Sequence, residues 1–550
     1  MMSRRLLLTL FALAMLTGPA CVATKAGAAN ADAADYPEVY QWSTTAEADG
    51  GGESRAFLWV PPEVDRIRGV LVGGRTLMEP EFAADPLIRA ACAEQKLAIV
   101  YFNPSLGSMF EFWQTDIDER LQQALDELGE KSGYEEIAVA PLFSYGHSVG
   151  AIFASRVARW APKRTFGTLI FKAGVVPVPD HVDAPITRIP LVQVQGQFEE
   201  FGRDNESREG GWQAGRRNLS RWREQDDDYL VSLVVEVGGT HFAWSEPVAE
   251  HIGLYLRDIT AKRLDDWPVD AEDPIELDFI EPEAGYLTSI HVEDPDRPRA
   301  APYDEFEGDP SEAFWHPSLR VAESTDAMHD EIYAKKPQFV TFVNPETGSE
   351  IHPGHDLRLR MSAHWVGPDE FKVDGTFLDE APRGYDAVDG EAGHGEGPVR
   401  FRRFGGSVEQ VDDDRFRVIR DPRRAMQADI LVYHPGDDEY RYAEQQGRIS
   451  LSEQLDDGEE QSITFDPPEQ IDADDMPLSL EAESTSDLPV RYHIVHGPAV
   501  IKDGELHLAD VPARADDTLE IKVVAYQWGS MVEPRVQSAE PVERIIEVTR

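Results

Sequence analysis

The chain has 550 residues, of which 41% are apolar, and a formal net charge of −50. A chain of this length exceeds what one core usually organises, so we expect two to four domains. Its acidic residues are spread over the whole length, and such a negative field repels nucleic acid and anionic membrane surfaces, so neither is an expected partner. The composition leaves the oligomeric state open.

The N-terminus has the features of a signal peptide. Arg4 and Arg5 precede an apolar run at 6–16, which is too short to span a bilayer. The tripeptide Ala-Gly-Ala at 26–28 has the small residues of a signal-peptide cleavage site. We therefore assign 1–28 to a signal peptide and expect export to the periplasm, the cell surface or the medium.

The two cysteines have different predicted roles. Cys21 directly follows the apolar run, which leaves open a lipoprotein anchor, and only then is a membrane an expected partner. The preceding residues 18–20, Gly-Pro-Ala, lack the leucine of a bacterial lipobox. After cleavage at residue 28 only Cys92 remains, so no intrachain disulfide forms. Cys92 lies in an apolar, helix-like run and is predicted to pack in a core.

Strand-like and helix-like segments alternate from residue 37 to residue 265. The expected strands are 55–60, 69–74, 97–102, 138–143, 168–171, 191–194 and 230–237. The expected helices are 81–94, 115–128, 151–160 and 250–264. Continuous apolar strands separated by helices predict an α/β domain with a parallel sheet covered on both faces.

The pattern changes near residue 266, where proline and acidic residues rise and helical periodicity largely vanishes. One further helix is predicted over 319–334, and short strand-like runs follow between 338 and 433. In the last ninety residues strand-like runs alternate with turn residues. This pattern predicts six short strands: 462–465, 478–482, 490–495, 506–508, 519–526 and 544–548. We expect a β-rich domain of unknown role over 270–455 and a β-sandwich over 461–550.

The sequence Gly-His-Ser-Val-Gly at 146–150 is the most informative motif of the chain. It has the G-x-S-x-G pattern and stands between a strand-like and a helix-like run, as a nucleophile elbow requires. Such a sharp turn raises the Ser148 hydroxyl above the sheet edge, and its flanking glycines let strand and helix approach closely. The motif alone is weakly specific, and an ordinary turn serine is the alternative.

A base and an acid follow at matching places. His241 stands in a Gly-Gly-Thr-His loop after the predicted strand 230–237, and Glu199 stands three residues after Gly196, beyond the preceding strand. Both loops leave the sheet at its carboxyl edge, beside the elbow. Nucleophilic cleavage of an ester needs a nucleophile, a base and a group that orients the base. Glu200 is the alternative acid, followed by Asp204.

On these motifs, residues 37–265 resemble an α/β-hydrolase of the serine esterase type. The resemblance implies the following roles: Ser148 as nucleophile, His241 as base, Glu199 as orienting acid, and the backbone N–H groups of Val149 and Arg75 as oxyanion donors. The family more often has aspartate as the acid. Its usual His-Gly after the oxyanion strand is Gly-Gly at 73–74 here. A residue next to Arg75 in the sequence is therefore an alternative for this donor.

Two further features bear on architecture. Only 19 residues separate Phe171 from Leu191, too few for the helical lid that many such hydrolases insert there, so we expect a domain without a cap and an open site. The segment 461–550 resembles the Ig-like repeats of bacterial surface proteins, on the short runs 461–465, 488–490 and 496–499. That resemblance implies a spacer or adhesion module.

Neither a cofactor nor a metal is expected. The chain has no glycine-rich phosphate loop. Five histidines outside the motifs show no metal-ligand spacing: His316, His329, His352, His355 and His364.

The sequence thus predicts an exported serine hydrolase that cleaves carboxylic esters through an acyl-enzyme. The expected partner is an ester substrate, with a bulky or polysaccharide-linked one as an open possibility. Two alternatives stay open: a peptidase of the same fold, and a non-catalytic surface-binding protein with a degenerate hydrolase domain.

Overall fold

The computed structural model describes residues 38–550 except 75–76, 108, 174–187, 200–210, 227, 269, 352–358, 382–391 and 422. The predicted signal peptide with Cys21 lies outside the described residues, as do Arg75, Glu200, Asp204, His352 and His355. So does most of the segment on which the expected absence of a cap depends. In the part of the chain that is described, no helix combines the length and the apolarity that crossing a bilayer requires.

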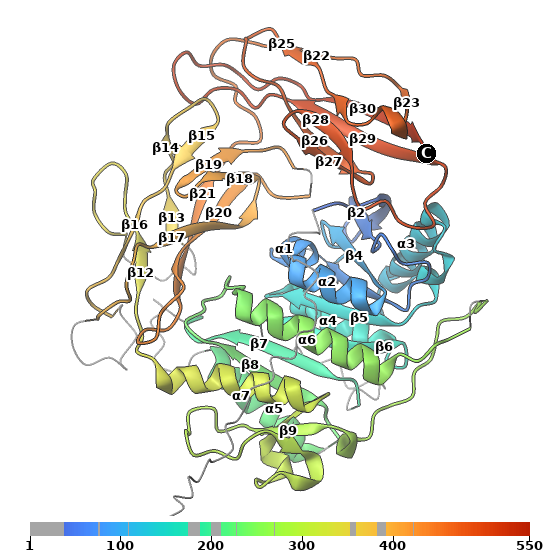
Figure 1. The fold of residues 1–550 in the computed structure, drawn as a ribbon, viewed down its shortest axis with the longest axis vertical. Helices are drawn as coiled ribbons and strands as arrows, with labels where there is room; N and C mark the ends of the chain where they lie inside the picture. The colour runs from blue at the N-terminus through green and yellow to red at the C-terminus, as the bar shows by residue number, and fades with distance from the viewer. Residues whose placement is uncertain are drawn as a thin grey trace, which may run out of the picture.

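An eight-stranded sheet forms the centre of the N-terminal region (Figure 1). Its strands, in the order β1-β2-β4-β3-β5-β6-β7-β8, are β1 (Trp42–Ala48), β2 (Gly52–Trp59), β3 (Gly69–Gly74), β4 (Leu97–Asn103), β5 (Leu142–His147), β6 (Thr165–Phe171), β7 (Leu191–Gly196) and β8 (Val231–Glu236). The six strands from β3 to β8 are parallel. The α/β fold predicted for this region is therefore confirmed.

The expectation of a wholly parallel sheet is wrong at one edge. β1 and β2 pair antiparallel with each other, and β2 pairs antiparallel with β4. Only residues 49–51 join β1 to β2, and two strands joined by so short a turn can pair only as an antiparallel hairpin. Gly50 and Gly51 both have positive φ in that turn.

Helices cover both faces of the sheet. They are α1 (Glu79–Ala84), α2 (Pro86–Gln95), α3 (Ile117–Ser132), α4 (Gly150–Trp160), α5 (Gly211–Gln225) and α6 (Glu246–Arg263). One apolar cluster joins α1, α2 and α6 to one face, through residues such as Leu71 and Leu169. A second cluster joins α3 and α4 to the other face, where α5 also packs. Cys92 is buried in the first cluster, as predicted.

Two local predictions are wrong for reasons that involve proline. The strand expected over 138–143 begins only at Leu142, because Pro141 has no N–H to donate, and residues 135–138 form a 3₁₀ turn instead. The single helix expected over 81–94 is two helices that meet at Asp85. Its carboxylate accepts the N–H groups of Leu87 and Ile88 and so starts a new helix, with Pro86 in its first position.

The apolar core of this region does not end at residue 265. A small sheet of β9 (Tyr286–Ser289), β10 (Ala301–Pro302) and β11 (Ala313–His316) is followed by α7 (Leu319–Ala334), which has its predicted bounds. Leu287, Trp315 and Val321 belong to the same cluster as the sheet residues. The apolar cluster of the α/β sheet thus continues past residue 265, and it also includes Phe404 and Leu431 further along the chain.

The rest of the chain is rich in strands, as predicted. Its first part contains β12 (Val340–Phe342), β13 (Leu359–Met361), β14 (His364–Trp365), β15 (Glu370–Lys372), β16 (Gly375–Phe377), β17 (Arg400–Gly406), β18 (Val408–Asp412), β19 (Arg415–Val418), β20 (Gln427–His434) and β21 (Ala443–Ser450). Its two larger sheets have the orders β13-β21-β20-β17 and β14-β15-β19-β18 and share an apolar core. Phe404 of β17 and Leu431 of β20 belong instead to the cluster of the α/β sheet. We call residues 336–451 the middle β region.

The C-terminal part contains β22 (Ile463–Phe465), β23 (Gln470–Asp472), β24 (Leu478–Ser479), β25 (Ala482–Ser484), β26 (Arg491–His496), β27 (Ala499–Lys502), β28 (Glu505–Leu508), β29 (Thr518–Tyr526) and β30 (Val542–Thr549). A four-stranded sheet, β23-β30-β29-β26, and two smaller sheets enclose a core of their own. The likeness to Ig-like repeats stays a prediction.

The C-terminal part contacts the α/β region (Figure 1). Gly497 N donates to the Tyr40 carbonyl oxygen at 2.9 Å. The Trp59 indole donates to Asp510 at 3.0 Å, and Arg514 pairs with the buried Glu136 at 3.0 Å. Such partly buried polar contacts fix the orientation of the two parts.

Candidate active site

Ser148 lies in a sharp turn between β5 and α4. Its φ of +53° is in the left-handed region, which is costly for a non-glycine residue and is typical of strained functional turns. A Cβ on Gly146 would lie 2.0 Å from the carbonyl oxygen of Gly150, so only glycine fits there. The residues of 146–150 therefore form the elbow that the sequence predicts, with Ser148 partly exposed at its tip.

Ser148, His241 and Glu199 form one hydrogen-bonded series. His241 Nε2 lies 3.0 Å from Ser148 Oγ, and His241 Nδ1 lies 3.0 Å from Glu199 Oε2. The second carboxylate oxygen, Oε1, accepts the N–H of Gly196 at 2.7 Å. The three residues follow β5, β8 and β7, whose carboxyl ends meet at one edge of the sheet. The structure thus places Glu199 against the histidine.

The surroundings of His241 favour one tautomer. A carboxylate only accepts hydrogen bonds, so Nδ1 carries the proton that faces Glu199, and Nε2 is left to accept from Ser148. The side chains of His241 and Glu199 are 12% and 6% exposed. Such burial strengthens the attraction between the carboxylate and an imidazole that takes up a second proton.

Val149 directly follows Ser148 and is the N-cap residue of α4. The first N–H groups of a helix have no partner within it, and they lie at the positive end of the helix dipole. The Val149 N–H is therefore well placed to stabilise an oxyanion beside Ser148. Arg75, the other predicted donor, follows the end of β3, which is the neighbour of β5 in the sheet.

Glu79 is a buried residue of the site that the sequence did not predict. Its Oε1 accepts the N–H of His147 at 2.8 Å, and its Oε2 accepts the N–H of Leu77 at 2.9 Å. One carboxylate thus joins the end of the nucleophile strand to the segment that follows β3. In the sequence Glu79 resembles any acidic residue in the first turn of a helix, so no local signal distinguishes it.

A buried ion pair fixes the end of the loop that carries His241. Lys172 Nζ pairs with Glu236 Oε2, and Glu236 Oε1 accepts the N–H of Ser245 at 2.6 Å. Burial alone would raise the pKa of Glu236, but the Lys172 ammonium outweighs it, so the pKa lies below its ordinary value. His147 adds a contact from the elbow, because its Nε2 lies 2.9 Å from the carbonyl oxygen of His241.

Two pockets in or beside the α/β region differ in volume and in position. A pocket of about 270 Å³ lies between the α/β region and the middle β region, with Met78, Asp85, Trp244, Arg402 and Phe404 among its lining residues. Trp244 follows His241 by three residues, so this pocket adjoins the loop of the predicted base.

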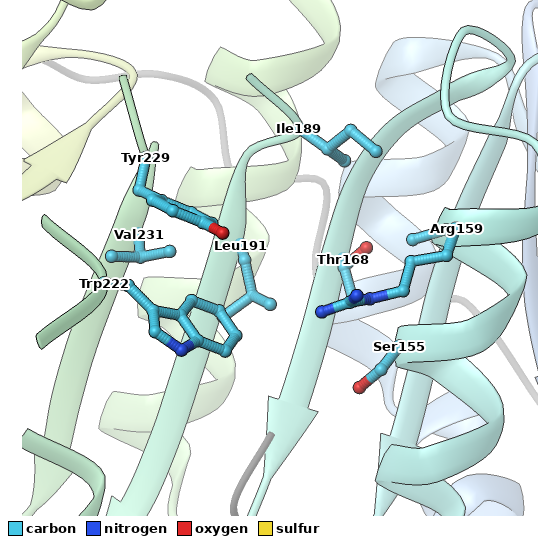
Figure 2. A pocket seen from close by; sticks show the side chains of 9 residues that line it. Ser155, Arg159, Thr168, Ile189, Leu191, Trp222, Tyr229 and Val231 are labelled. Atoms are coloured by element: carbon cyan, nitrogen blue, oxygen red, sulfur yellow. The ribbon is translucent and has the colours of Figure 1, made fainter. Parts of the chain in front are cut away.

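The second pocket lies on the face of the sheet that α4 and α5 cover (Figure 2). Arg159, Trp222 and Tyr229 are among its lining residues, and its volume of about 30 Å³ is much smaller than that of the first pocket.

No metal centre is found in the described part of the chain, where no group of three or more His, Cys, Asp or Glu side chains is arranged to hold an ion. Among the histidines named from the sequence, His316 and His329 are buried in the core and His364 is exposed.

No family model matches the chain, and no curated protein matches it. Three solved structures are similar to part of the chain. Est1E from Butyrivibrio proteoclasticus has 14% identity and a TM-score of 0.26, covering 40% of this chain and 98% of its own. LpqC, a poly(3-hydroxybutyrate) depolymerase from Bordetella parapertussis, has 14% identity and a TM-score of 0.27, covering 42% and 96%. An S-formylglutathione hydrolase from Agrobacterium tumefaciens has 15% identity and a TM-score of 0.28, covering 41% and 95%. The geometry of the site stands independently of these likenesses.

Proposed function

We propose that this protein is a serine hydrolase that cleaves carboxylic esters through an acyl-enzyme. The observation that carries the proposal is the series from Ser148 Oγ through the His241 ring to the Glu199 carboxylate, with both distances at 3.0 Å. A nucleophile, a base and an orienting group in this order are the parts that acyl transfer requires.

In the proposed reaction, His241 Nε2 takes the proton of Ser148 as Oγ attacks the ester carbonyl carbon. The imidazolium that results is stabilised by Glu199, whose second oxygen is held by Gly196 N–H. His241 then gives the proton to the leaving alcohol, and an acyl-enzyme on Ser148 remains. A water molecule, activated by the same histidine, releases the acid.

The negative charge that develops on the carbonyl oxygen needs fixed donors. Val149 N–H, at the start of α4, is one proposed donor, and Arg75 N–H is the other. Preorganised donors of this kind contribute about 3 to 4 kcal/mol each to transition-state stabilisation. Glu79 supports this arrangement, because it joins the segments on which the two donors lie.

Covalent labelling tests the proposal directly. The full-length protein should react with a fluorophosphonate probe, and mass spectrometry should locate the adduct on Ser148. Ser155 provides a matched control, since it is a buried serine of α4 whose hydroxyl donates to the Ala151 carbonyl oxygen. Ser148→Ala should abolish labelling and Ser155→Ala should retain it. A wild-type protein that is neither labelled nor hydrolytic would instead support the surface-binding alternative.

A substrate panel separates the remaining parts of the proposal. Short-chain aryl esters, acetylated xylan and peptide anilides distinguish a small-ester esterase, an enzyme for polysaccharide-linked esters and a peptidase. We expect turnover of esters to exceed that of amides. Turnover of the peptide anilide above that of every ester would replace the esterase with a peptidase of the same fold. Export and a lipid anchor at Cys21 also remain proposals, which fractionation of the producing cells would decide.

A further inference from the structure

We infer that Glu444, on β21 of the middle β region, is a positioning residue that holds the loop bearing His241. The inference rests on the proposed function and deepens it, because it makes the middle β region a part of the catalytic apparatus. Its basis is a set of contacts between residues that lie about two hundred positions apart in the chain.

Glu444 contacts the residue directly before His241. Its Oε1 accepts two hydrogen bonds from Thr240, one from the hydroxyl at 2.7 Å and one from the backbone N–H at 3.3 Å. Its Oε2 accepts the hydroxyl of Tyr442 at 2.6 Å. The side chain of Glu444 is fully buried, with 0% exposure. A buried carboxylate is stable only when its oxygens are satisfied, so the bonds to Thr240 hold Glu444 as firmly as they hold the loop.

The charges around Glu444 indicate that its role is to accept hydrogen bonds. Burial and the nearby Glu236 raise the pKa of Glu444, and Arg402, at 3.9 Å, opposes them. An amide has nearly the same shape as this carboxylate and keeps one acceptor oxygen. Glutamine should therefore substitute for it, since its amide oxygen can accept the same bonds from Thr240.

The loop is fixed on the same side at two further residues. Gly238 has a φ of +74°, and a Cβ there would lie 1.8 Å from the Tyr442 carbonyl oxygen, so the loop backbone lies directly against β21. The ring of Phe242 packs against Phe404 of β17, with centroids 5.3 Å apart. Alternate residues 238, 240 and 242 thus contact the middle β region, while His241 between them contacts Ser148 and Glu199.

This arrangement has a consequence for catalysis. Proton transfer between Ser148 and His241 depends on the position of the imidazole, and a displacement of about 1 Å can cost on the order of 10²-fold in rate. Ser245 N–H, bonded to Glu236, fixes the far end of the loop within the α/β region. Thr240, immediately before the base, is fixed by Glu444 from the middle β region.

The test compares three variants of the full-length protein. Glu444→Ala should lower kcat on an aryl ester by about 10- to 100-fold, with KM changed by less than about threefold, because Glu444 acts on the position of the base rather than on substrate binding. The labelling rate of Ser148 should fall in parallel. Glu444→Gln should stay within about threefold of wild type, because it keeps the acceptor for Thr240. Asp369→Asn is the control, a buried carboxylate that bonds Arg491 at 2.9 Å between the two β-rich parts. It should leave kcat unchanged.

Hydrogen exchange of the amides in 237–245 provides a readout that does not need activity. Exchange there should be faster in Glu444→Ala and unchanged in Asp369→Asn. If Glu444→Ala does not fold, Thr240→Val removes the stronger of the two bonds with little change of shape and should show both effects to a smaller extent. Wild-type exchange, kcat and labelling in a folded variant would overturn the inference. An unreactive wild-type protein would overturn the proposed function, and hydrogen exchange would still decide whether Glu444 holds the loop.

Discussion

The α/β region and the middle β region contribute to the site in different ways. In the α/β region the groups of the proposed reaction lie in short loops directly after apolar strands, and each has a local sequence signal. The middle β region supplies none of these groups, yet the Glu444 carboxylate and the Tyr442 backbone contact the loop that bears His241. The groups of the proposed reaction thus have local sequence signals, whereas their surroundings include contacts between distant segments.

Charged residues of the middle β region pair with acidic residues of the α/β region. The chain carries a net charge of −50, but eight arginines fall between residues 400 and 424. Arg424 is one of them, 2% exposed in its side chain, and it pairs with Glu38 at 2.8 Å and with Glu81 at 3.1 Å, both in the α/β region. Burial alone would raise the pKa of Glu38, but Arg424 and its neighbouring arginines lower it to about 2. Part of this arginine cluster thus neutralises acidic residues at the boundary.

The largest expected effect removes the chemistry from the α/β region alone. Ser148→Ala should lower kcat on an aryl ester by about 10⁴-fold or more, since only binding and oxyanion stabilisation would remain. Thermal unfolding should change little, because the side chain is small and partly exposed. Steady-state kinetics with the folded variant checks this, and turnover near the wild-type level would mean that another residue is the nucleophile.

The second prediction concerns the acid. Glu199→Gln should lower kcat by about 10³- to 10⁴-fold, because an amide in place of the carboxylate neither selects the right tautomer of His241 nor stabilises the imidazolium. Glu200→Gln is the matched control and should be mild. The reverse pattern would move the role to Glu200, and two mild effects would point to Asp204.

The third prediction tests the boundary between the two regions. Arg424→Met removes one buried partner from Glu38, Glu81 and Asp421, and it should lower the free energy of unfolding by about 3 to 5 kcal/mol. Arg544→Met is the control, because Arg544 is 42% exposed and its partner Asp466 is 76% exposed. Arg544→Met should lower the free energy of unfolding by less than about 1 kcal/mol. Equal effects in urea denaturation would show that the buried pairs do not stabilise the boundary.

The smallest expected effect is a loss of stability in mild acid. Burial lowers the pKa of His251 to about 4 and that of His329 to about 3. Below pH 6.5 the unfolded chain binds protons that these buried histidines do not, so stability is full above that pH and falls as the pH approaches the folded values. Each of the two histidines should lower the free energy of unfolding by about 2 kcal/mol at pH 5 relative to pH 7.

Unfolding measured at pH 7 and pH 5 checks this prediction. His251→Asn, which can keep the bond from the ring Nδ1 position to Ser324, should reduce the difference between the two pH values. The exposed His364→Asn should leave it unchanged. A stability that is equal at both pH values in the wild type would contradict the prediction.

The sequence by itself determined the parts of this protein that depend on neighbouring residues. Apolar runs separated by amphipathic segments specify the α/β region, because their periodicity decides which face is buried. The glycines around Ser148, and the places of His241 and Glu199 after their strands, are also local, since a turn between a strand and a helix is specified by the few residues that form it.

The tertiary structure alone decided the rest. Glu79, Glu236 and Glu444 are ordinary acidic residues in the sequence, and they acquire roles only because folding removes them from water next to particular N–H and O–H groups. The core that continues past residue 265 is another such case, because Trp315 and Val321 pack on a sheet formed by strands far earlier in the chain. Periodicity shows that a side chain will be buried. Which distant groups will satisfy a buried carboxylate depends on how the regions pack against each other, and no local pattern contains that information.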